Sequence, residues 1–177
     1  MRLTLETERL ILRPFTMDDA EAMFYGWASD PEVTRYLTWN PHQSIEDTKA
    51  VLAMWIEQYE KPERLNFAIE LKEDGTLIGG IDVVGYLDGT PVIGYNLGKK
   101  YWNKGYMTEA CKCLLAYLFS KGFKEVRIDA HIDNIGSNRV IRKCGGIFVQ
   151  TEEHYFPHKN VTHKINHYIV KADTVAG

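Results

Sequence analysis

Apolar and polar residues alternate with a period of two along the middle of the chain, and this alternation predicts β-strands. Three strands are expected over 66–71, 77–84 and 91–97, joined by polar turns at 72–75 and 87–89. The same analysis predicts an earlier strand over 9–13 and later strands over 125–132, 147–151 and 165–170.

Apolar positions with helical spacing separate these strands. Thr16 and Ser44 are expected to cap helices, the first running to about residue 25 and the second with an apolar stripe from Thr48 to Tyr59. Further helices are predicted at 30–32, 107–118 and 134–142. The order β-αα-βββ-α-β-α-ββ indicates one mixed α/β domain over residues 1–177, with a frayed tail at 172–177.

Composition narrows the class of protein. The chain has 177 residues, of which 45% are hydrophobic, and its net charge of −3 lacks the basic excess typical of nucleic-acid binding. No apolar run approaches the roughly 18 residues of a membrane span, and the charged first 15 residues do not resemble a signal peptide. Cys111, Cys113 and Cys144 favour neither a disulfide framework nor a metal site, so we predict a reducing, cytoplasmic location.

Charge is unevenly distributed along the chain. Residues 99–143 hold ten basic and four acidic side chains, a local net charge of +6, so the remaining residues carry −9. A positive segment in an acidic chain predicts a bounded site for an anionic ligand.

The strongest local motif lies in this segment: a strand, a loop and a helix start between Ile93 and Ala110. The first amides of a helix are unpaired and partially positive, so a loop that gathers them can hold a phosphate or pyrophosphate. Gly105 would allow close approach of the ligand, and Thr108 could add a hydroxyl donor. The alternative is a solvated loop in which Gly105 serves only the turn. Neither G-x-x-x-x-G-K-[ST] nor G-x-G-x-x-G occurs, which disfavours ATP and dinucleotide enzymes.

Three motifs resemble one known family. Residues 101–110 (YWNKGYMTEA) resemble the acetyl-CoA pyrophosphate loop of the GNAT superfamily of N-acetyltransferases. Their run Trp-x-Lys-Gly-Tyr-x-Thr-Glu-Ala is similar to the RimJ/RimL-type branch, which acetylates protein N-termini. Residues 6–14 (ETERLILRP) and 134–145 (NIGSNRVIRKCG) are similar to two further elements of that branch, in the same order.

The resemblance implies a GNAT-like single α/β domain whose mixed, mostly antiparallel sheet splays at the acetyl-CoA site, with helices on both faces. Backbone groups of Asn96 and Leu97 would pair with the pantetheine arm, and an N–H at Leu97 would stabilise the oxyanion. Asn134 would bond the pantetheine amide, whereas Lys143 and Arg139 would either meet phosphate or stay solvated. The residues expected to contact acetyl-CoA are Asn96, Leu97, Trp102, Asn103, Lys104, Gly105, Tyr106, Met107, Thr108, Asn134, Ser137 and Lys143.

The implied chemistry is attack of an amine on the thioester, which requires removal of a proton from the amine and protonation of the leaving thiolate. Ser137 is the expected proton donor, with a helix cap or surface hydroxyl as its alternative role. The base is open, because a base acting through water is as compatible as any single residue. The substitutes by strand position alone are Asp82, Glu70 and His131, each with a structural or solvated role as its alternative.

Three positions depart from the family pattern. Ile141 stands where many members have a tyrosine acid, and Val92 stands where many have a glutamate base. Gly146 replaces a common phenylalanine, which puts packing near the cofactor in question.

The acceptor groove of this fold is bordered by the C-terminal hairpin. Its expected residues, which could receive a cationic amine or be ordinary surface and core groups, are Tyr36, Trp39, Glu152 and Glu153. No metal site is predicted from the nearby histidines, because the hairpin is expected to place them on different faces. These histidines are His154, His158, His163 and His167.

The sequence therefore predicts an acetyl-CoA-dependent N-acetyltransferase, a monomer or homodimer, whose acceptor is a primary amine and, by branch, a protein N-terminus. Two alternatives stay open. One is an acetyltransferase for a small amine such as a polyamine, an aminoglycoside or an amino-acid derivative. The other is a non-catalytic acyl-CoA-binding module, which the residues at positions 92 and 141 make conceivable.

Overall fold

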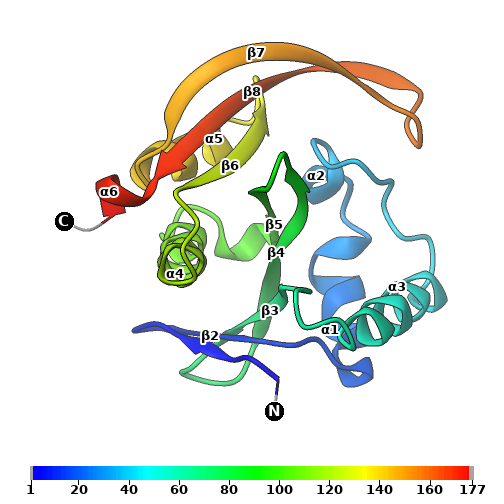
Figure 1. The fold of residues 1–177 in the computed structure, drawn as a ribbon. Helices are drawn as coiled ribbons and strands as arrows, with labels where there is room; N and C mark the ends of the chain where they lie inside the picture. The colour runs from blue at the N-terminus through cyan, green and yellow to red at the C-terminus, as the bar shows by residue number, and fades with distance from the viewer. Residues whose placement is uncertain (1, 176–177) are drawn as a thin grey trace.

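The computed structural model describes residues 2–175, and within them eight strands form one sheet in the order β1-β2-β3-β4-β5-β6-β8-β7 (Figure 1). Neighbouring strands are antiparallel except β5 and β6, which run parallel. The expected mixed, mostly antiparallel sheet is confirmed. The strands are β1 (Leu5–Glu6), β2 (Leu10–Arg13), β3 (Asn66–Leu71), β4 (Leu77–Leu87), β5 (Thr90–Leu97), β6 (Glu125–His131), β7 (Ile147–Phe156) and β8 (Val161–Lys171).

Helices cover both faces of the sheet (Figure 1). One apolar core joins the sheet to α4 and α5, and a second core on the other face joins Phe15 and Ala68 to α1 and α3. The α-helices are α1 (Ala20–Met23), α2 (Pro31–Thr34), α3 (Ile45–Gln58), α4 (Tyr106–Ser120), α5 (Ile135–Lys143) and α6 (Ala172–Val175). Single helical turns lie at Met17–Asp19 and Lys99–Tyr101 (3-10) and at Phe24–Ala28 (π). None of the helices in residues 2–175 is long and apolar enough to cross a membrane.

Both predicted N-caps precede helices. The Thr16 backbone N–H donates to Asp19 Oδ2 at 2.8 Å, and the Ser44 backbone N–H donates to Asp47 Oδ2 at 3.4 Å. The first helical segment does not end near residue 25 but continues as the π turn to residue 28. That extension places Trp27, which is 1% exposed, in the second core.

The C-terminal region differs most from the prediction. The β7–β8 hairpin extends well beyond 147–151 and 165–170. The prediction was too short because polar residues dominate the middle of the hairpin, at 152–154 and 162–164, and interrupt the hydrophobic pattern. Residues 172–175 form α6 rather than a frayed end, and 176–177 lie outside the described residues.

The sheet splays between its two parallel strands. Only Val92 and Ile93 of β5 pair with β6, opposite Arg127 and Ile128, although β5 continues to Leu97. The C-terminal half of β5 therefore has a strand on one side only, and the site lies at this opening.

Candidate active site

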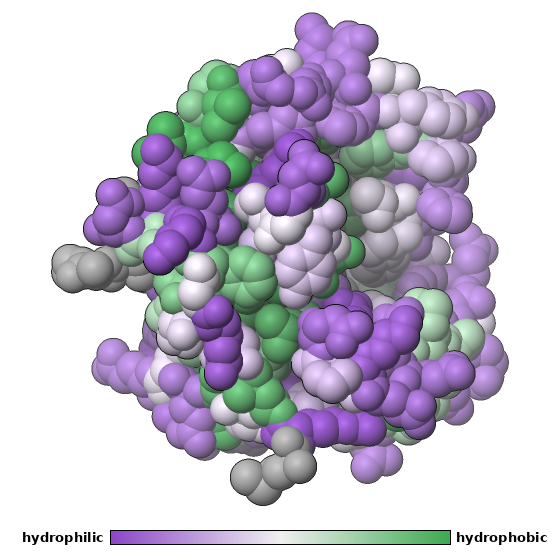
Figure 2. Space-filling view, in the orientation of Figure 1, coloured by the Kyte–Doolittle hydropathy of each residue, from purple (hydrophilic) through white to green (hydrophobic). Residues whose placement is uncertain are grey.

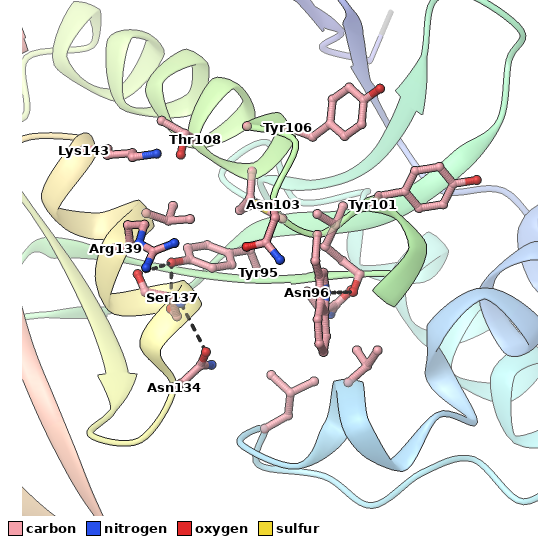
Figure 3. A pocket seen from close by; sticks show the side chains of 18 residues that line it. Tyr95, Asn96, Tyr101, Asn103, Tyr106, Thr108, Asn134, Ser137, Arg139 and Lys143 are labelled. Carbon is pink, nitrogen blue, oxygen red and sulfur yellow. Dashed lines mark hydrogen bonds between the residues drawn. The ribbon is translucent and has the colours of Figure 1, made fainter.

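A cavity of about 250 Å³, here called the helix-end cavity, occupies the opening beside β5 (Figure 3). The start of α4 and one face of α5 form its walls. Its lining includes most of the residues predicted to contact acetyl-CoA: Asn96, Leu97, Trp102, Asn103, Gly105, Tyr106, Met107, Thr108, Asn134, Ser137 and Lys143.

The loop before α4 is shaped to present backbone amides. Asn103 and Gly105 have positive φ angles of 60° and 81°, so the chain curls directly before the helix starts. The first amides of this 15-residue helix have no partner within it and carry its partial positive charge. The loop and helix start together form an anion cradle.

Two basic side chains of α5 line the same cavity. Arg139 and Lys143 are one helical turn apart, and Figure 3 shows the Lys143 ammonium directed toward Thr108 at the start of α4. The sequence left two roles open for these side chains, contact with phosphate or solvation, and their position in the cavity supports contact with phosphate. Lys104 is exposed and its side chain does not line the cavity, so only the backbone of this residue stays a candidate for contact with acetyl-CoA.

Arg9, which sequence analysis did not select, anchors the loop from the first strand segment. Its guanidinium lies 4.3 Å from the centre of the Tyr106 ring and donates to Glu109 at 2.8 Å and to the Lys104 carbonyl at 3.1 Å. The similarity of residues 6–14 to the family therefore has a structural reason, since this segment braces the anion cradle.

The register between β4 and β5 decides which backbone groups face the opening. Gly98 N–H bonds to the Ile78 carbonyl, and in an antiparallel pair alternate residues form such bonds. Asn96 is therefore bonded toward β4, whereas the N–H and C=O of Leu97 point into the opening, where Trp102 Nε1 donates to the Leu97 carbonyl at 2.8 Å. This agrees with the predicted donor at Leu97 and corrects the expectation for the Asn96 backbone.

Ser137 meets a tyrosine that the sequence analysis missed. Its Oγ lies 2.8 Å from the Tyr95 hydroxyl, and its backbone N–H donates to Asn134 Oδ1 at 3.1 Å (Figure 3). Asn134 is thus the N-cap of α5, and the serine hydroxyl is left to pair with Tyr95. Burial raises the pKa of Tyr95 well above its usual value, so its hydroxyl stays protonated.

A second cavity of about 510 Å³, here called the sheet-face cavity, lies under the β7–β8 hairpin, where Figure 2 shows the surface hollowed. Aromatic and polar side chains both line it. The aromatic ones are Phe15, Tyr36, Trp39, Trp55 and Phe156, and the polar ones include Asn66, Asp82, Asp129, His131 and His154. Tyr36 and Trp39, two of the residues predicted to receive the acceptor, therefore line this cavity.

The two cavities meet at the opening in the sheet. Both are lined by Leu37, Tyr95, Asn96, Asn134 and Ser137. A group held at this junction touches the contents of both cavities.

Asp82 is the only predicted base whose position and bonding suit that role. Its side chain is 21% exposed in the sheet-face cavity, and it pairs with Arg64, whose Nη2 lies 3.2 Å from Oδ2. Burial raises the pKa of Asp82 to about 6, although Arg64 opposes the shift. A Cβ on Gly94 would lie 3.7 Å from Asp82 Oδ1, so the carboxylate reaches over the strand that carries Val92.

The other two base candidates are occupied. Glu70 accepts from Arg13 Nε at 2.6 Å and lines neither cavity. His131 lies in the sheet-face cavity, but its Nδ1 accepts from the Asp133 backbone N–H and its Nε2 meets His163 Nδ1, both at 3.0 Å. Burial lowers the pKa of His131, so its ring is neutral near pH 7.

The hairpin residues correct two expectations. Neither Glu152 nor Glu153 lines the sheet-face cavity, and Glu153, which pairs in register with Lys164, lies on the face opposite Glu152. The histidines do not point to different faces, because His154, His163 and His167 share one face of the hairpin; the fourth, His158, lies in its turn.

The departures at positions 141 and 146 fit one another. Ile141 is fully buried, and a Cβ on Gly146 would lie 2.4 Å from its Cγ2 and 2.8 Å from its carbonyl oxygen. Gly146 N–H and Gly145 N–H bond to the carbonyls of Ile141 and Arg142, which closes α5 as a Schellman motif. The missing phenylalanine thus has no room here.

Two buried amides line the sheet-face cavity without partners. Asn66 Nδ2 and Asn96 Oδ1 have no hydrogen bond among the described residues, although neither atom reaches solvent. Since an unsatisfied buried amide is costly, these atoms fit a ligand that supplies an acceptor and a donor.

Known proteins are similar to this chain in sequence and in fold. The model of the acetyltransferase (GNAT) domain matches residues 9–147. An uncharacterized N-acetyltransferase, YoaA of Bacillus subtilis (strain 168), is 33% identical over 144 residues, which cover 80% of this chain and 81% of YoaA. The crystal structure of a GNAT-family acetyltransferase from Bacillus anthracis is 26% identical, with a TM-score of 0.83 over 97% of this chain and 99% of that one.

RimL, a ribosomal L7/L12 α-N-protein acetyltransferase solved with coenzyme A, shares the fold, with 18% identity and a TM-score of 0.83 over 97% of this chain and 99% of RimL. The anion cradle, the splayed sheet and the match to the family model lead to one conclusion. The chain belongs to the GNAT family of N-acetyltransferases, enzymes that use acetyl-CoA as the acetyl donor.

Proposed function

We propose that this protein transfers the acetyl group of acetyl-CoA to the α-amine of a peptide or protein N-terminus in the cytoplasm. The observation that carries the proposal is the junction of the two cavities at Tyr95, Asn96 and Ser137. One cavity offers an anion cradle and the other a carboxylate among aromatic walls, so donor and acceptor can meet where they join. The free thiols of Cys111, Cys113 and Cys144 are compatible with a reducing compartment.

The residues of the helix-end cavity fit acetyl-CoA. The positive-φ loop at Asn103 and Gly105 and the cations at Arg139 and Lys143 suit its phosphates, and the unpaired Asn96 Oδ1 suits an amide N–H of its pantetheine arm. When bound, acetyl-CoA supplies the activated thioester. The Leu97 N–H, which points into the opening, donates to the oxygen on which negative charge develops.

Asp82 removes the proton from the acceptor ammonium, directly or through a water. With a pKa of about 6, it is mostly ionised at neutral pH and still basic enough to accept a proton. An α-ammonium with a pKa near 8 differs from this carboxylate by about 2 units, whereas a lysine-like ammonium differs by about 4. The base therefore favours α-amines over polyamines.

Ser137 donates the proton that the leaving thiolate takes up. The Tyr95 hydroxyl, 2.8 Å away and held protonated, orients the serine and can donate a hydrogen bond to the serine oxygen as that oxygen gives up its proton. Tyr95 lies on β5 and Ser137 on α5, and together they take the role of the tyrosine that is missing at position 141.

The sheet-face cavity suits a peptide. Its volume of about 510 Å³ holds more than an amine alone, and the unpaired Asn66 Nδ2 is a donor for a peptide carbonyl. The RimJ/RimL-type motifs and the shared fold with RimL support the same acceptor class.

The test is thiol release from acetyl-CoA with three acceptor sets: peptides with a free N-terminus, the same peptides blocked at the N-terminus but containing lysine, and small amines. We expect turnover with the free peptides alone. Turnover confined to small amines would replace this proposal with the small-molecule alternative. Tight CoA binding without turnover on any acceptor would leave the non-catalytic binding module.

A further inference from the structure

Three side chains of the β7–β8 hairpin bring their donor atoms to one point. Glu152 Oε2 lies 3.0 Å from His167 Nε2 and 3.4 Å from His154 Nε2, and the two histidine nitrogens are 3.2 Å apart. An ion about 2.0–2.1 Å from three donors at tetrahedral angles would hold them about 3.3–3.4 Å apart. The three atoms thus match one face of a zinc tetrahedron.

The hairpin register produces this triangle. Glu152 and His154 are two residues apart on β7, and His167 projects from β8 on the same face. Two ligands at i and i+2 on one strand and a third on its neighbour need no loop to bring them together. The sheet itself therefore fixes the site.

Two side chains behind His167 hold its ring in place. Asp129 Oδ1 lies 2.7 Å from His167 Nδ1, and Nη2 of Arg127 contacts the same nitrogen, so Nε2 is directed toward Glu152 and His154. Metal-binding histidines commonly bond a carboxylate in this way, which orients the ring and raises its basicity. His167 is buried, with a side chain only 4% exposed, so it cannot turn away easily.

The charge and access of the cluster suit a divalent ion. With neutral imidazoles, Glu152, Asp129 and the guanidinium of Arg127 carry a net charge of −1. Arg127 Nε donates to Asp129 at 2.9 Å, and its Nη2 contacts His167 Nδ1 and lies 3.1 Å from His167 Nε2, so the guanidinium competes with an ion for this imidazole. Glu152 and His154 are each 43% exposed, and an ion can enter from that side.

We infer that Glu152, His154 and His167 form a binding site for a divalent transition-metal ion, Zn²⁺ being the best match to two imidazoles and one carboxylate. His154 also lines the sheet-face cavity, so the ion would sit in the wall of that cavity with its fourth position open. The site uses none of the residues that the proposed acetyl transfer requires.

The test is a zinc titration of the untagged, chelator-treated protein in competition with a chromophoric chelator, with native mass spectrometry for stoichiometry. We expect one Zn²⁺ per chain. Glu152→Gln and His154→Gln, both at exposed positions that should fold, should each weaken binding at least about tenfold. Arg127→Gln should tighten it by removing the competing arm.

His158→Gln is the matched control, because this exposed histidine lies in the hairpin turn outside the triangle. It should bind zinc like the wild-type protein. The inference is overturned if the wild-type protein binds no stoichiometric zinc, or if Glu152→Gln and His154→Gln bind as tightly as His158→Gln. Neither readout depends on acetyl transfer, so the result is independent of the proposed function.

Discussion

The two cavities are built in different ways. The helix-end cavity takes most of its lining from two short stretches, 95–108 and 134–143, and its anion cradle consists of backbone amides. The sheet-face cavity gathers side chains from residue 15 to residue 165, across both sides of the opening. Because the cradle consists of backbone amides, a short motif is enough to build it, whereas the sheet-face cavity depends on side chains that only the complete fold brings together.

The largest effect on the helix-end cavity is expected for Gly105→Glu. A carboxylate next to the cradle opposes phosphate, so CoA affinity should fall at least about 100-fold, the equivalent of losing two charge-assisted hydrogen bonds. The nearest atom to a Cβ at this position is Arg9 Nη2 at 3.4 Å, so the fold should persist. Calorimetric titration with CoA measures the effect.

Gly89→Glu is its matched control. Gly89 has the same φ of 81° and lies in an open turn, so it carries the same backbone strain and the same added charge away from the site. Equal CoA affinity in the two variants would contradict the cradle.

The sheet-face cavity should respond to Asp82→Asn in turnover and not in CoA affinity. Loss of a general base should lower kcat about 100-fold or more. Since burial raises the pKa of Asp82 to about 6, the wild-type kcat/KM for the acceptor should fall as the pH drops below 6, where the carboxylate becomes protonated. The variant should lack this acid limb.

Asp88→Asn, in the exposed turn after β4, should leave both rate and pH profile unchanged. An acid limb that persists in Asp82→Asn would remove Asp82 from the mechanism.

The junction itself is tested by Ser137→Ala and Tyr95→Phe. We expect kcat to fall about 100-fold in the first variant and about tenfold in the second, with CoA affinity nearly unchanged. Because the two hydroxyls act as one unit, the double variant should be little worse than Ser137→Ala. If the losses of kcat in the two single variants added up in the double variant, Tyr95 would only pack against its neighbours. A similar loss in the exposed control Tyr86→Phe would lead to the same conclusion.

The smallest effect is expected for Lys143→Gln. Removing one cation beside the cradle should raise the KM for acetyl-CoA about threefold to tenfold, and the difference should shrink as salt is added. A salt-independent change would show that the side chain does not act through its charge.

The same contrast explains how much the sequence could predict. The motif around Gly105 and the cap at Asn134 are local, so the element order and the cofactor residues follow from spacing and resemblance. Tyr95 was missed because its approach to Ser137 depends on the parallel pairing of β5 with β6, which no local pattern reveals.

The histidines were misplaced for a geometric reason. Phe156 pairs with Val161, so from Gln150 to Phe156 the even-numbered β7 residues share a face with the odd-numbered β8 residues between Val161 and His167. A turn one residue longer would reverse that relation, and the sequence alone does not set the turn length. Asp82 was identified only as one of three candidate bases, because the hydrogen bonds made by Glu70 and His131 come from distant segments.

The most direct measurement of the central claim, that the two cavities form one continuous site, is the affinity of a bisubstrate analogue. CoA would be joined through its sulfur and an acetyl bridge to the α-amine of a short peptide and titrated against CoA alone. The account predicts that the analogue binds at least about 100-fold tighter than CoA, since both cavities are filled at once, and that Gly105→Glu removes most of this binding. An analogue that binds no tighter than CoA would contradict it.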